Sequence, residues 1–204
     1  MKVGVLDDYL GCARDLADWS GVEARATVTV FGEPVTDPAA RLADFDVLCL
    51  MRDRTPLPAA TLARLPKLKL ISFTGPSNAT LDTAAALSHG ITVCHTDRGR
   101  PESTAELIWG LILATVRQLP ANEASLRAGQ WQRSLGVVLA GKTIGLIGLG
   151  RLGQRIAAYA DAFGMHVLAW SRHLTDEQAA RHGAQRMDLD ELLNCPMWSV
   201  CTSR

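Results

Sequence analysis

Residues 142–170 read KTIGLIGLGRLGQRIAAYADAFGMHVLAW, and the hydrophobic period changes twice within this stretch. The apolar run 142–147 predicts a buried strand. Apolar residues then recur at helical spacing as far as Phe163, Gly164 closes the predicted helix, and residues 165–170 predict another strand. A strand, a helix and a strand in this order are typical of one βαβ unit in a parallel sheet.

The turn between this strand and this helix carries the pattern G-x-G-x-x-G. Its first glycine would permit a tight turn, its second would let the backbone approach a pyrophosphate, and its third would let the helix pack closely on the strand. Backbone N–H groups around Arg151 and Leu152 would meet the phosphates at the positive end of the helix dipole. The alternative is a glycine-rich turn without a ligand. In this context the pattern predicts a dinucleotide site at Gly148, Leu149, Gly150, Arg151, Leu152 and Gly153.

The residues after the second strand bear on the choice of cofactor. Dinucleotide sites place an acidic residue about 20 positions beyond the glycines, where it accepts hydrogen bonds from ribose hydroxyls. This chain has Ser171, Arg172 and His173 instead. A hydroxyl beside a guanidinium suits a 2′-phosphate better than a carboxylate would. We therefore expect NAD or NADP as cofactor and favour NADP; in the alternative, Arg172 is a solvated surface charge and the site takes NAD.

Strands and helices also alternate along the first hundred residues, which predicts a parallel sheet with crossover helices. Ligands of such sheets bind at the carboxyl ends of the strands, so the polar loops at residues 52–55, 74–78 and 95–97 are candidate site segments. Strands are predicted at 2–6, 24–31, 47–51, 68–73 and 91–94, and helices around 13–17 and at 39–45, 59–65 and 81–89.

A long helix is predicted at residues 103–119. Ser103 and Glu106 fit a capping box at its start, and Pro120 is expected to end it. A second helix with the stretch 129–135 follows. We place a domain boundary near residues 100–101, which divides the chain into domains 1–100 and 101–204.

Composition excludes several classes of protein. The 204 residues include 21 Lys+Arg and 21 Asp+Glu, so no basic surface for nucleic acid is expected. No apolar run approaches the roughly 20 residues of a membrane span. The four apolar or glycine residues at 3–6 are too short for a signal peptide, which predicts a cytoplasmic location. The five scattered cysteines lack metal-site spacing, and we expect reduced thiols and no metal.

The chain resembles the D-isomer-specific 2-hydroxyacid dehydrogenases from residue 1 to about residue 193. The resemblance implies an α/β fold with two parallel sheets: a flavodoxin-like substrate domain at 1–100, then the first part of a Rossmann NAD(P)-binding domain at 101–204. It also implies hydride transfer between NAD(P)H and a small 2-hydroxy or 2-oxo acid. Its marks are Thr74-Gly75 with Asn78 and Asp82, residues 103–106, residues 139–143 and the glycine pattern.

Carried over by position, the resemblance implies that the loop 75–78 offers backbone N–H groups to the substrate carboxylate. Arg52, Gly75, Ser77 and Asn78 would then be the substrate-binding residues. The alternative for Asn78 and Asp82 is a turn followed by a helix cap. Thr104 corresponds to a position near the nicotinamide, or it only caps its helix. The helix from residue 103 resembles the family's dimer-forming region, so a homodimer is expected.

The family's catalytic Arg, Glu and His are expected beyond residue 204. The tail 195–204, CPMWSVCTSR, looks unlike a strand, whereas a displaced reading frame can spell the family's Asp-Val-Val-Ser-Val-His-Leu. We hypothesise a frameshift near residue 195; the alternative is a natural short protein with a divergent tail. We therefore expect a truncated dehydrogenase with little or no turnover, or else a non-catalytic dinucleotide-binding remnant or interaction module.

Overall fold

The computed structural model describes residues 1–97, 99, 101–194 and 198–201. Contacts between Cα atoms divide the chain into unit 1, Met1–Gly99, and unit 2, Arg100–Arg204. Residue 100 of the expected boundary lies outside the described residues, as do residues 195–197 and 202–204 of the tail to which the frameshift hypothesis applies.

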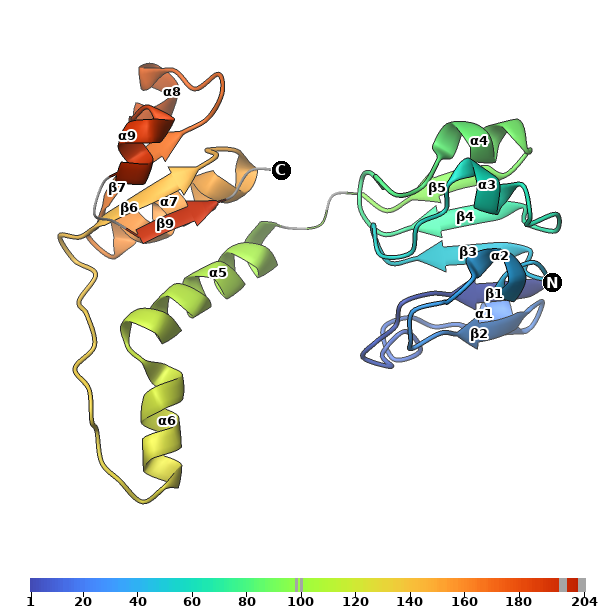
Figure 1. The fold of residues 1–204 in the computed structure, drawn as a ribbon, viewed down its shortest axis with the longest axis horizontal. Coiled ribbons are helices and arrows are strands. Elements are labelled where there is room, and N and C mark those ends of the chain that lie inside the picture. The colour runs from blue at the N-terminus through green and yellow to red at the C-terminus, as the bar shows by residue number, and fades with distance from the viewer. Residues whose placement is uncertain (98, 100, 195–197, 202–204) are drawn as a thin grey trace. The chain divides into compact units, whose positions relative to one another are not determined.

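Unit 1 contains a five-stranded sheet in the order β2-β1-β3-β4-β5, with every neighbouring pair parallel (Figure 1). This is the flavodoxin-like order, in which the chain reverses direction across the sheet beside β1. The expected α/β fold is confirmed, and each predicted strand is present. The strands are β1 Lys2–Val5, β2 Thr27–Val30, β3 Val47–Leu50, β4 Leu70–Phe73 and β5 Thr92–His95.

The helices of unit 1 are short. Asp37 and Asp82 cap two of them, because their side chains accept hydrogen bonds from the N–H groups of Ala40 and Ala85. The helix expected around residues 13–17 is wrong: these residues form turns and bends, because the Asp8 carboxylate takes backbone N–H groups at the start of the segment. The helices are α1 Ser20–Glu23, α2 Pro38–Arg41, α3 Ala59–Leu62 and α4 Thr83–Ser88.

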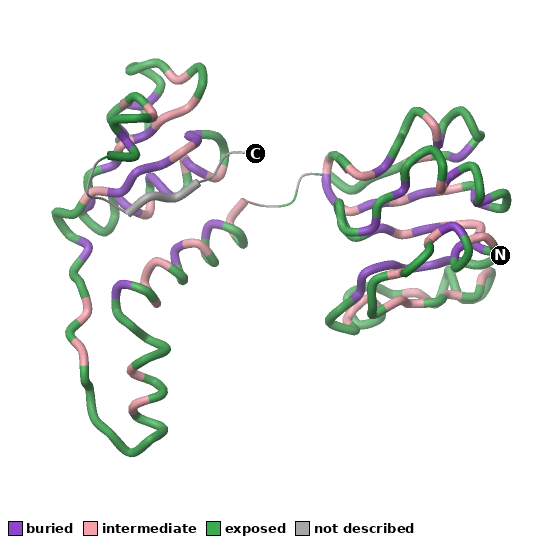
Figure 2. The backbone as a smooth tube through the Cα atoms, viewed as in Figure 1, coloured by how far each residue is buried: buried purple, intermediate pink, exposed green. Residues whose placement is uncertain are grey.

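Buried residues lie along β1, β3 and β4, the three central strands of unit 1 (Figure 2). In β3 and β4 every second residue is buried, and Leu48 and Ile71 are fully inaccessible. The strand ends are therefore held by a packed core, and the loops that follow them start from fixed positions.

Unit 2 contains a four-stranded parallel sheet in the order β8-β7-β6-β9. Dinucleotide-binding sheets have this arrangement: the second and third strands lie on one side of the first, and the fourth lies on the other. The expectation that the tail is unlike a strand is wrong for the backbone of 198–201, which pairs with β6. The strands are β6 Thr143–Ile147, β7 His166–Trp170, β8 Ala184–Arg186 and β9 Trp198–Cys201.

Two helices precede this sheet, α5 Pro101–Val116 and α6 Leu119–Arg127. The predicted capping box is wrong, since α5 begins at Pro101 and Ser103 lies within its first turn. Proline suits that first position because it has no N–H to leave unpaired. Pro120 does not end α5 either: the helix stops at Val116, and Pro120 lies in the first turn of α6.

The helix expected to include residues 129–135 is wrong: α6 ends at Arg127, residues 128–129 form a turn, and residues 130–139 have no regular element. The segment instead bonds to the helices before it. The Trp131 carbonyl accepts from the Ser125 hydroxyl at 3.1 Å, and the Val137 N–H donates to the Val116 carbonyl at 2.8 Å. These tertiary hydrogen bonds take the place of helical ones.

The remaining helices of unit 2 alternate with its strands along the chain. They are α7 Arg151–Ala162, α8 Asp176–Ala180 and α9 Leu189–Asn194. Ile156, Ala157 and Ala160 of α7 are fully buried in the core of unit 2, and Trp109 of α5 packs edge-on against Tyr159 of α7. Gly164 closes α7 as predicted, with its N–H donating to the Asp161 carbonyl. Of the helices in the described ranges, none is long and apolar enough for a bilayer crossing.

Candidate functional site

The glycine turn of unit 2 connects β6 to α7. Gly148 has φ +107°, a conformation that side chains with a Cβ rarely adopt, and its N–H donates to the Trp170 carbonyl at 2.7 Å. Gly150 has an ordinary φ of −78°, and beyond its own and its chain neighbours' atoms no heavy atom lies within 4 Å of the place where its Cβ would be. The fold therefore needs glycine at 148, whereas at 150 the bare backbone faces open space that a ligand could enter.

A cavity of about 590 Å³ adjoins this turn. Its walls come from the glycine turn, the start of α7, the turn after β7, and α8 with the residues just after it. No Asp or Glu is among the residues that line it. The lining residues are Leu149, Gly150, Gln154, Ser171, Arg172, His173, Leu174, Gln178, Arg181 and His182.

Ser171 joins the two turns of this site. The Leu149 N–H donates to the Ser171 Oγ at 2.8 Å, so this N–H is already used within the protein. Arg151 and Leu152 do not line the cavity; they form the first turn of α7, where backbone N–H groups have no partner within the helix. Gly153 is buried in the same helix, as close packing on the sheet requires.

The cavity fits the adenosine side of a dinucleotide. Its volume is that of a small-molecule site, and Gly150 would allow a pyrophosphate to approach the start of α7. The predicted residues Ser171 and Arg172 line this cavity. Arg181 and His182 also line it and were not predicted, because no motif marks residues that follow a helix beyond the glycine pattern.

In unit 1, the loops after β3 and β4 are tied together. The Arg52 N–H donates to the Thr74 hydroxyl at 3.1 Å, and its carbonyl accepts from the Asn78 side chain at 2.6 Å. The Asp53 carboxylate accepts from the Ala79 N–H at 2.7 Å. Arg52 has φ 51°, so these bonds hold a residue that is not glycine in the left-handed region.

Asn78 and Asp82 adopt the turn and helix cap that formed one of the two alternatives. The Asn78 Oδ1 accepts from the N–H groups of Thr80 and Leu81 at 2.9 and 3.0 Å, and the Asp82 carboxylate caps α4. The side chain of Asn78 is therefore occupied in holding its own turn and the loop of Arg52.

The Gly75 N–H donates to the Thr96 hydroxyl at 2.8 Å, and its contact with a substrate carboxylate stays a prediction. Across the described residues, the backbone N–H groups of Ser77 and Asn78 have no hydrogen-bond partner. Arg52 Nη1 lies 3.3 Å from the place that a Cβ on Gly75 would take. Two N–H groups and one guanidinium on these loops could therefore hold an anion.

Behind these loops, the carboxylate of Asp7 is 2% exposed and anchors the segment that follows Arg52. It accepts from the Thr55 hydroxyl at 2.8 Å and from the Tyr9 hydroxyl at 3.1 Å. Arg54 donates to the Asp7 carbonyl at 3.1 Å and lies over the Tyr9 ring. Sequence reasoning did not single out Asp7, because its partners Thr55 and Arg54 are distant in sequence.

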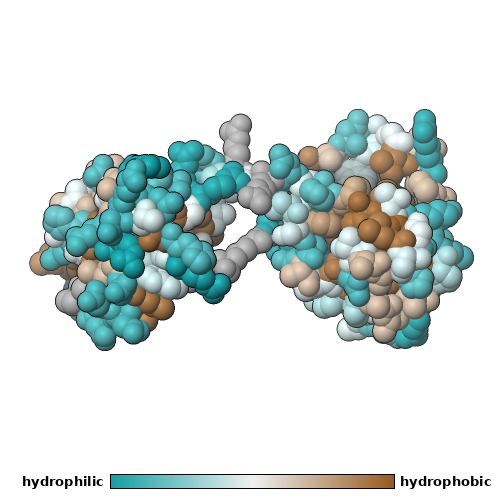
Figure 3. Space-filling model, turned by 90° about the horizontal axis from the view of Figure 1, so that it is seen from above, coloured by the Kyte–Doolittle hydropathy of each residue, from teal (hydrophilic) through white to brown (hydrophobic). Residues whose placement is uncertain are grey.

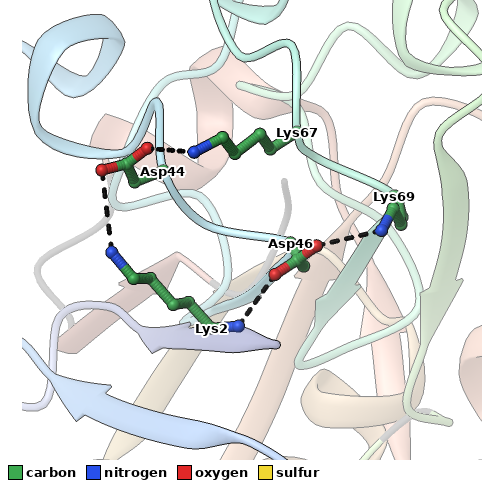
Figure 4. Close-up of polar contacts among 5 residues, drawn as sticks. All are labelled: Lys2, Asp44, Asp46, Lys67 and Lys69. Carbon is green, nitrogen blue, oxygen red and sulfur yellow. Dashed lines mark hydrogen bonds and ion pairs between the residues drawn. The ribbon is translucent and has the colours of Figure 1, made fainter.

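At the opposite, amino-terminal edge of this sheet, five charged residues form a network (Figure 4). Lys67 and Lys69 pair with Asp44 and Asp46 at 2.5 and 3.0 Å, and Lys2 contacts both carboxylates. The Lys67 ammonium lowers the pKa of Asp44, and the Lys2 backbone N–H lowers the pKa of Asp46. These ion pairs connect the start of β1 with the residues just before β3 and β4. They lie away from the candidate site.

Thr104 lies exposed in the first turn of α5 and does not line the cavity, so its proximity to a nicotinamide stays a prediction. Cys12, Cys49 and Cys94 are free thiols, and burial raises the pKa of Cys12 and of Cys49. Within the described parts of the chain, no group of three or more potential ligands could hold a metal ion.

Comparison with known proteins supports the fold. The family described as D-isomer specific 2-hydroxyacid dehydrogenase, NAD binding domain, matches residues 109–201. Phosphoglycerate oxidoreductase from Vibrio cholerae O395 superposes with a TM-score of 0.89 at 37% identity, over 100% of this chain and 67% of that chain. The chain belongs to the D-isomer-specific 2-hydroxyacid dehydrogenase family. The sheet of unit 2 is the Rossmann-type sheet of this family's NAD-binding domain.

Two other members of the family extend the comparison. D-3-phosphoglycerate dehydrogenase of Mycobacterium leprae is 37% identical over 182 residues, which is 83% of this chain and 34% of that protein. D-Lactate dehydrogenase from Aquifex aeolicus, solved with NAD and lactic acid, superposes with a TM-score of 0.71 at 26% identity, over 94% of this chain and 57% of that chain. The chain spans about a third of the length of the curated relatives that it matches.

Proposed function

We propose that this chain provides substrate- and dinucleotide-binding parts of an oxidoreductase that transfers hydride between a nicotinamide cofactor and a small 2-hydroxy or 2-oxo acid. The observation that carries the proposal is the cavity beside Gly150, in a chain of the 2-hydroxyacid dehydrogenase family. In this proposal residues 1–100 form the substrate domain and residues 101–204 form the cofactor domain.

In this proposal unit 2 binds the cofactor and unit 1 binds the substrate. The first turn of α7 would hold the pyrophosphate, and the cavity would hold the adenosine. In unit 1, the N–H groups of Ser77 and Asn78 and the guanidinium of Arg52 would hold the substrate carboxylate. The nicotinamide, when bound, supplies the hydride chemistry.

For the cofactor we favour NADP over NAD. Arg172 lies exposed at the mouth of a cavity without acidic lining, next to the Ser171 hydroxyl. A carboxylate there would repel a 2′-phosphate, whereas a guanidinium attracts it. In the alternative, Arg172 is a solvated surface charge and the site takes NAD. The chain would then bind NADH more tightly than NADPH.

Titration of the chain with NADPH and NADH, followed by protein fluorescence, tests this choice. Arg172→Gln should lower NADPH affinity about tenfold and leave NADH affinity unchanged, because one charge-assisted contact is lost. Arg186→Gln is the matched control, since Arg186 lies on β8 and does not line the cavity. Tighter binding of NADH than of NADPH by the unaltered chain would exclude the preference for NADP.

We also infer that the chain by itself binds the cofactor but has little or no turnover. Neither His166 nor His173 is placed for acid–base work on a substrate: His166 begins β7, at the amino-terminal edge of the sheet, and His173 lines the cavity. A non-catalytic dinucleotide-binding or interaction module is the second candidate function. Turnover of glyoxylate or hydroxypyruvate at ordinary dehydrogenase rates would contradict both this inference and the second candidate.

A second copy of this chain is the partner we propose for α5, α6 and the segment after them. Their surface is largely exposed (Figure 2) and carries apolar side chains, with Trp131 at 81% and Leu135 at 87% exposure. Exposed apolar area of this kind marks interaction surfaces, although scattered hydrophobic residues occur on both units (Figure 3).

Light scattering after gel filtration tests this homodimer. The double variant Leu107→Glu, Leu111→Glu places charges on the exposed apolar side of α5 and should convert a dimer to monomer. Leu87→Glu is the matched control, because Leu87 is as exposed on α4 of unit 1. A monomeric unaltered chain would contradict the proposed dimer.

A further inference from the structure

The cavity of unit 2 has a second cationic wall, which the glycine pattern does not predict. Arg172 lies in the turn after β7, and Arg181 lies at the C-terminal end of α8; both line the same cavity. His173 and His182 line it beside them. Two arginine residues from separate elements therefore line a cavity whose lining includes no Asp or Glu.

The two walls are held to each other by the capping box of α8. The Thr175 hydroxyl accepts from the Gln178 N–H at 3.2 Å, and the Thr175 N–H donates to the Gln178 side chain at 3.1 Å. The Leu174 N–H donates to the Ser171 carbonyl at 3.1 Å. The turn that carries Arg172 thus leads directly into α8, which Arg181 follows, so these bonds fix the backbone positions of both arginines beside the cavity.

Arg181 has a partner that a phosphate could displace. Its guanidinium pairs with Glu177, one helical turn earlier, at 2.5 Å, and the two side chains are 66% and 78% exposed. An ion pair so open to water is weak, whereas a dianionic phosphate accepts charge-assisted and bidentate hydrogen bonds from arginine. Glu177 does not line the cavity, so it competes for Arg181 without blocking the space.

We propose that Arg181 is a second specificity-determining residue for the 2′-phosphate of NADP, opposite Arg172, and that Glu177 weakens this contact by competing for its guanidinium. The inference rests on the proposed dinucleotide binding and deepens it. If Arg181 and Glu177 formed only a surface ion pair, changing either residue would alter the stability of the chain slightly and would not alter which ligand it binds.

Calorimetric titration with adenosine 2′,5′-bisphosphate and adenosine 5′-monophosphate tests the proposal, because the two probes differ only in the 2′-phosphate. Arg181→Gln should lower affinity for the bisphosphate about tenfold and leave the monophosphate unchanged. Glu177→Gln should raise bisphosphate affinity about two- to threefold, since it frees Arg181. Arg186→Gln, away from the cavity, should change neither.

The outcomes separate this inference from the proposed function. If Arg172→Gln weakens bisphosphate binding while Arg181→Gln and Glu177→Gln leave it within twofold, the role of Arg181 is wrong and the preference for NADP stands. If the unaltered chain binds both probes equally, the preference and the role of Arg181 both fail. If it binds neither probe, the proposed dinucleotide site fails. Circular dichroism of each variant checks that α8 and the sheet remain folded.

Discussion

In unit 1, the candidate substrate loops are shaped by side chains: Asn78, Asp53 and the buried Asp7 hold the segment around Arg52 through hydrogen bonds. In unit 2, the turn after β6 is shaped by glycine, and a cavity of about 590 Å³ lies beside it. Backbone N–H groups remain for a ligand in both units, but different residues make this possible. Changes in the loops of unit 1 should therefore affect stability first, and changes at Gly150 should affect binding first.

The largest expected effect is at Gly148, where unit 2 depends on a backbone conformation. Gly148→Val should lower the free energy of unfolding of unit 2 by roughly 3 kcal/mol, because a β-branched residue at φ +107° is strongly strained. Hydrogen exchange of the β6 and α7 amides measures the loss. Unchanged protection of these amides would mean that the turn tolerates a side chain at position 148, and would contradict the dependence of unit 2 on glycine there.

In unit 1, the corresponding change removes a side chain. Asn78→Ala deletes the bonds to Arg52, Thr80 and Leu81 and should lower the free energy of unfolding of unit 1 by about 2 kcal/mol. Asn78→Asp, which keeps the acceptor oxygen but loses the donor to the Arg52 carbonyl, should lower it less. Hydrogen exchange in β3 and β4 distinguishes the two variants, and equal losses would show that only the donor matters.

Gly150→Ala separates binding from stability in unit 2. Its φ is ordinary and no heavy atom lies within 4 Å of the added Cβ, so the free energy of unfolding should stay within about 0.5 kcal/mol. Affinity for NADPH should fall about tenfold, because the methyl group would occupy the approach of the pyrophosphate. Unaltered affinity would place the pyrophosphate elsewhere.

The amino-terminal edge of unit 1 should respond to pH. The folded-state pKa values of Asp44 and Asp46 lie below the ordinary 3.8, so their ionised forms stabilise the fold above that value. This contribution is lost as pH falls from 3.8 through the lowered folded-state pKa values. Urea unfolding between pH 5 and pH 2.5 should show a smaller decline for Asp44→Asn, Asp46→Asn than for the unaltered chain; equal declines would contradict this source.

The smallest expected effect is at the ion pair between Glu102 of α5 and Arg155 of α7, 2.8 Å apart and open to water. Glu102→Gln should change the free energy of unfolding by no more than about 0.5 kcal/mol, since apolar contacts such as Trp109 with Tyr159 hold these helices together. Urea unfolding in low and high salt measures it. A loss comparable to that of Asn78→Ala would show that the pair matters more than its exposure implies.

Much of the fold could be predicted because its signals are local. Apolar runs located each strand of unit 1, and the period change around the glycine pattern located β6, α7 and β7. Prediction failed around residues 13–17 and 129–135, where helical spacing or a continuing helix was expected. Around 129–135 hydrogen bonds to α5 and α6 replaced the helical ones, and at the start of 13–17 the Asp8 carboxylate takes backbone N–H groups. Hydrophobic spacing reveals neither arrangement.

The candidate site divides in the same way. Ser171 and Arg172 were singled out from their spacing beyond the glycines. Arg181 was not, because no motif marks it, and Asp7 was not, because its buried partner Thr55 lies 48 residues away in the chain. The N–H of Gly75 was expected to face a ligand, and only the folded loop shows that the Thr96 hydroxyl takes it.

The sequence by itself determined the α/β class, the positions of the unit 1 strands and of β6 and β7, and the glycine turn, because these follow from hydrophobic period and from backbone conformations open only to glycine. Tertiary structure alone decided which backbone N–H groups remain unpaired, which charges border the cavity and how the loop of Arg52 is held. Hydrogen bonds and ion pairs act over a few ångströms in space. Two residues separated by so short a distance can lie far apart along the chain.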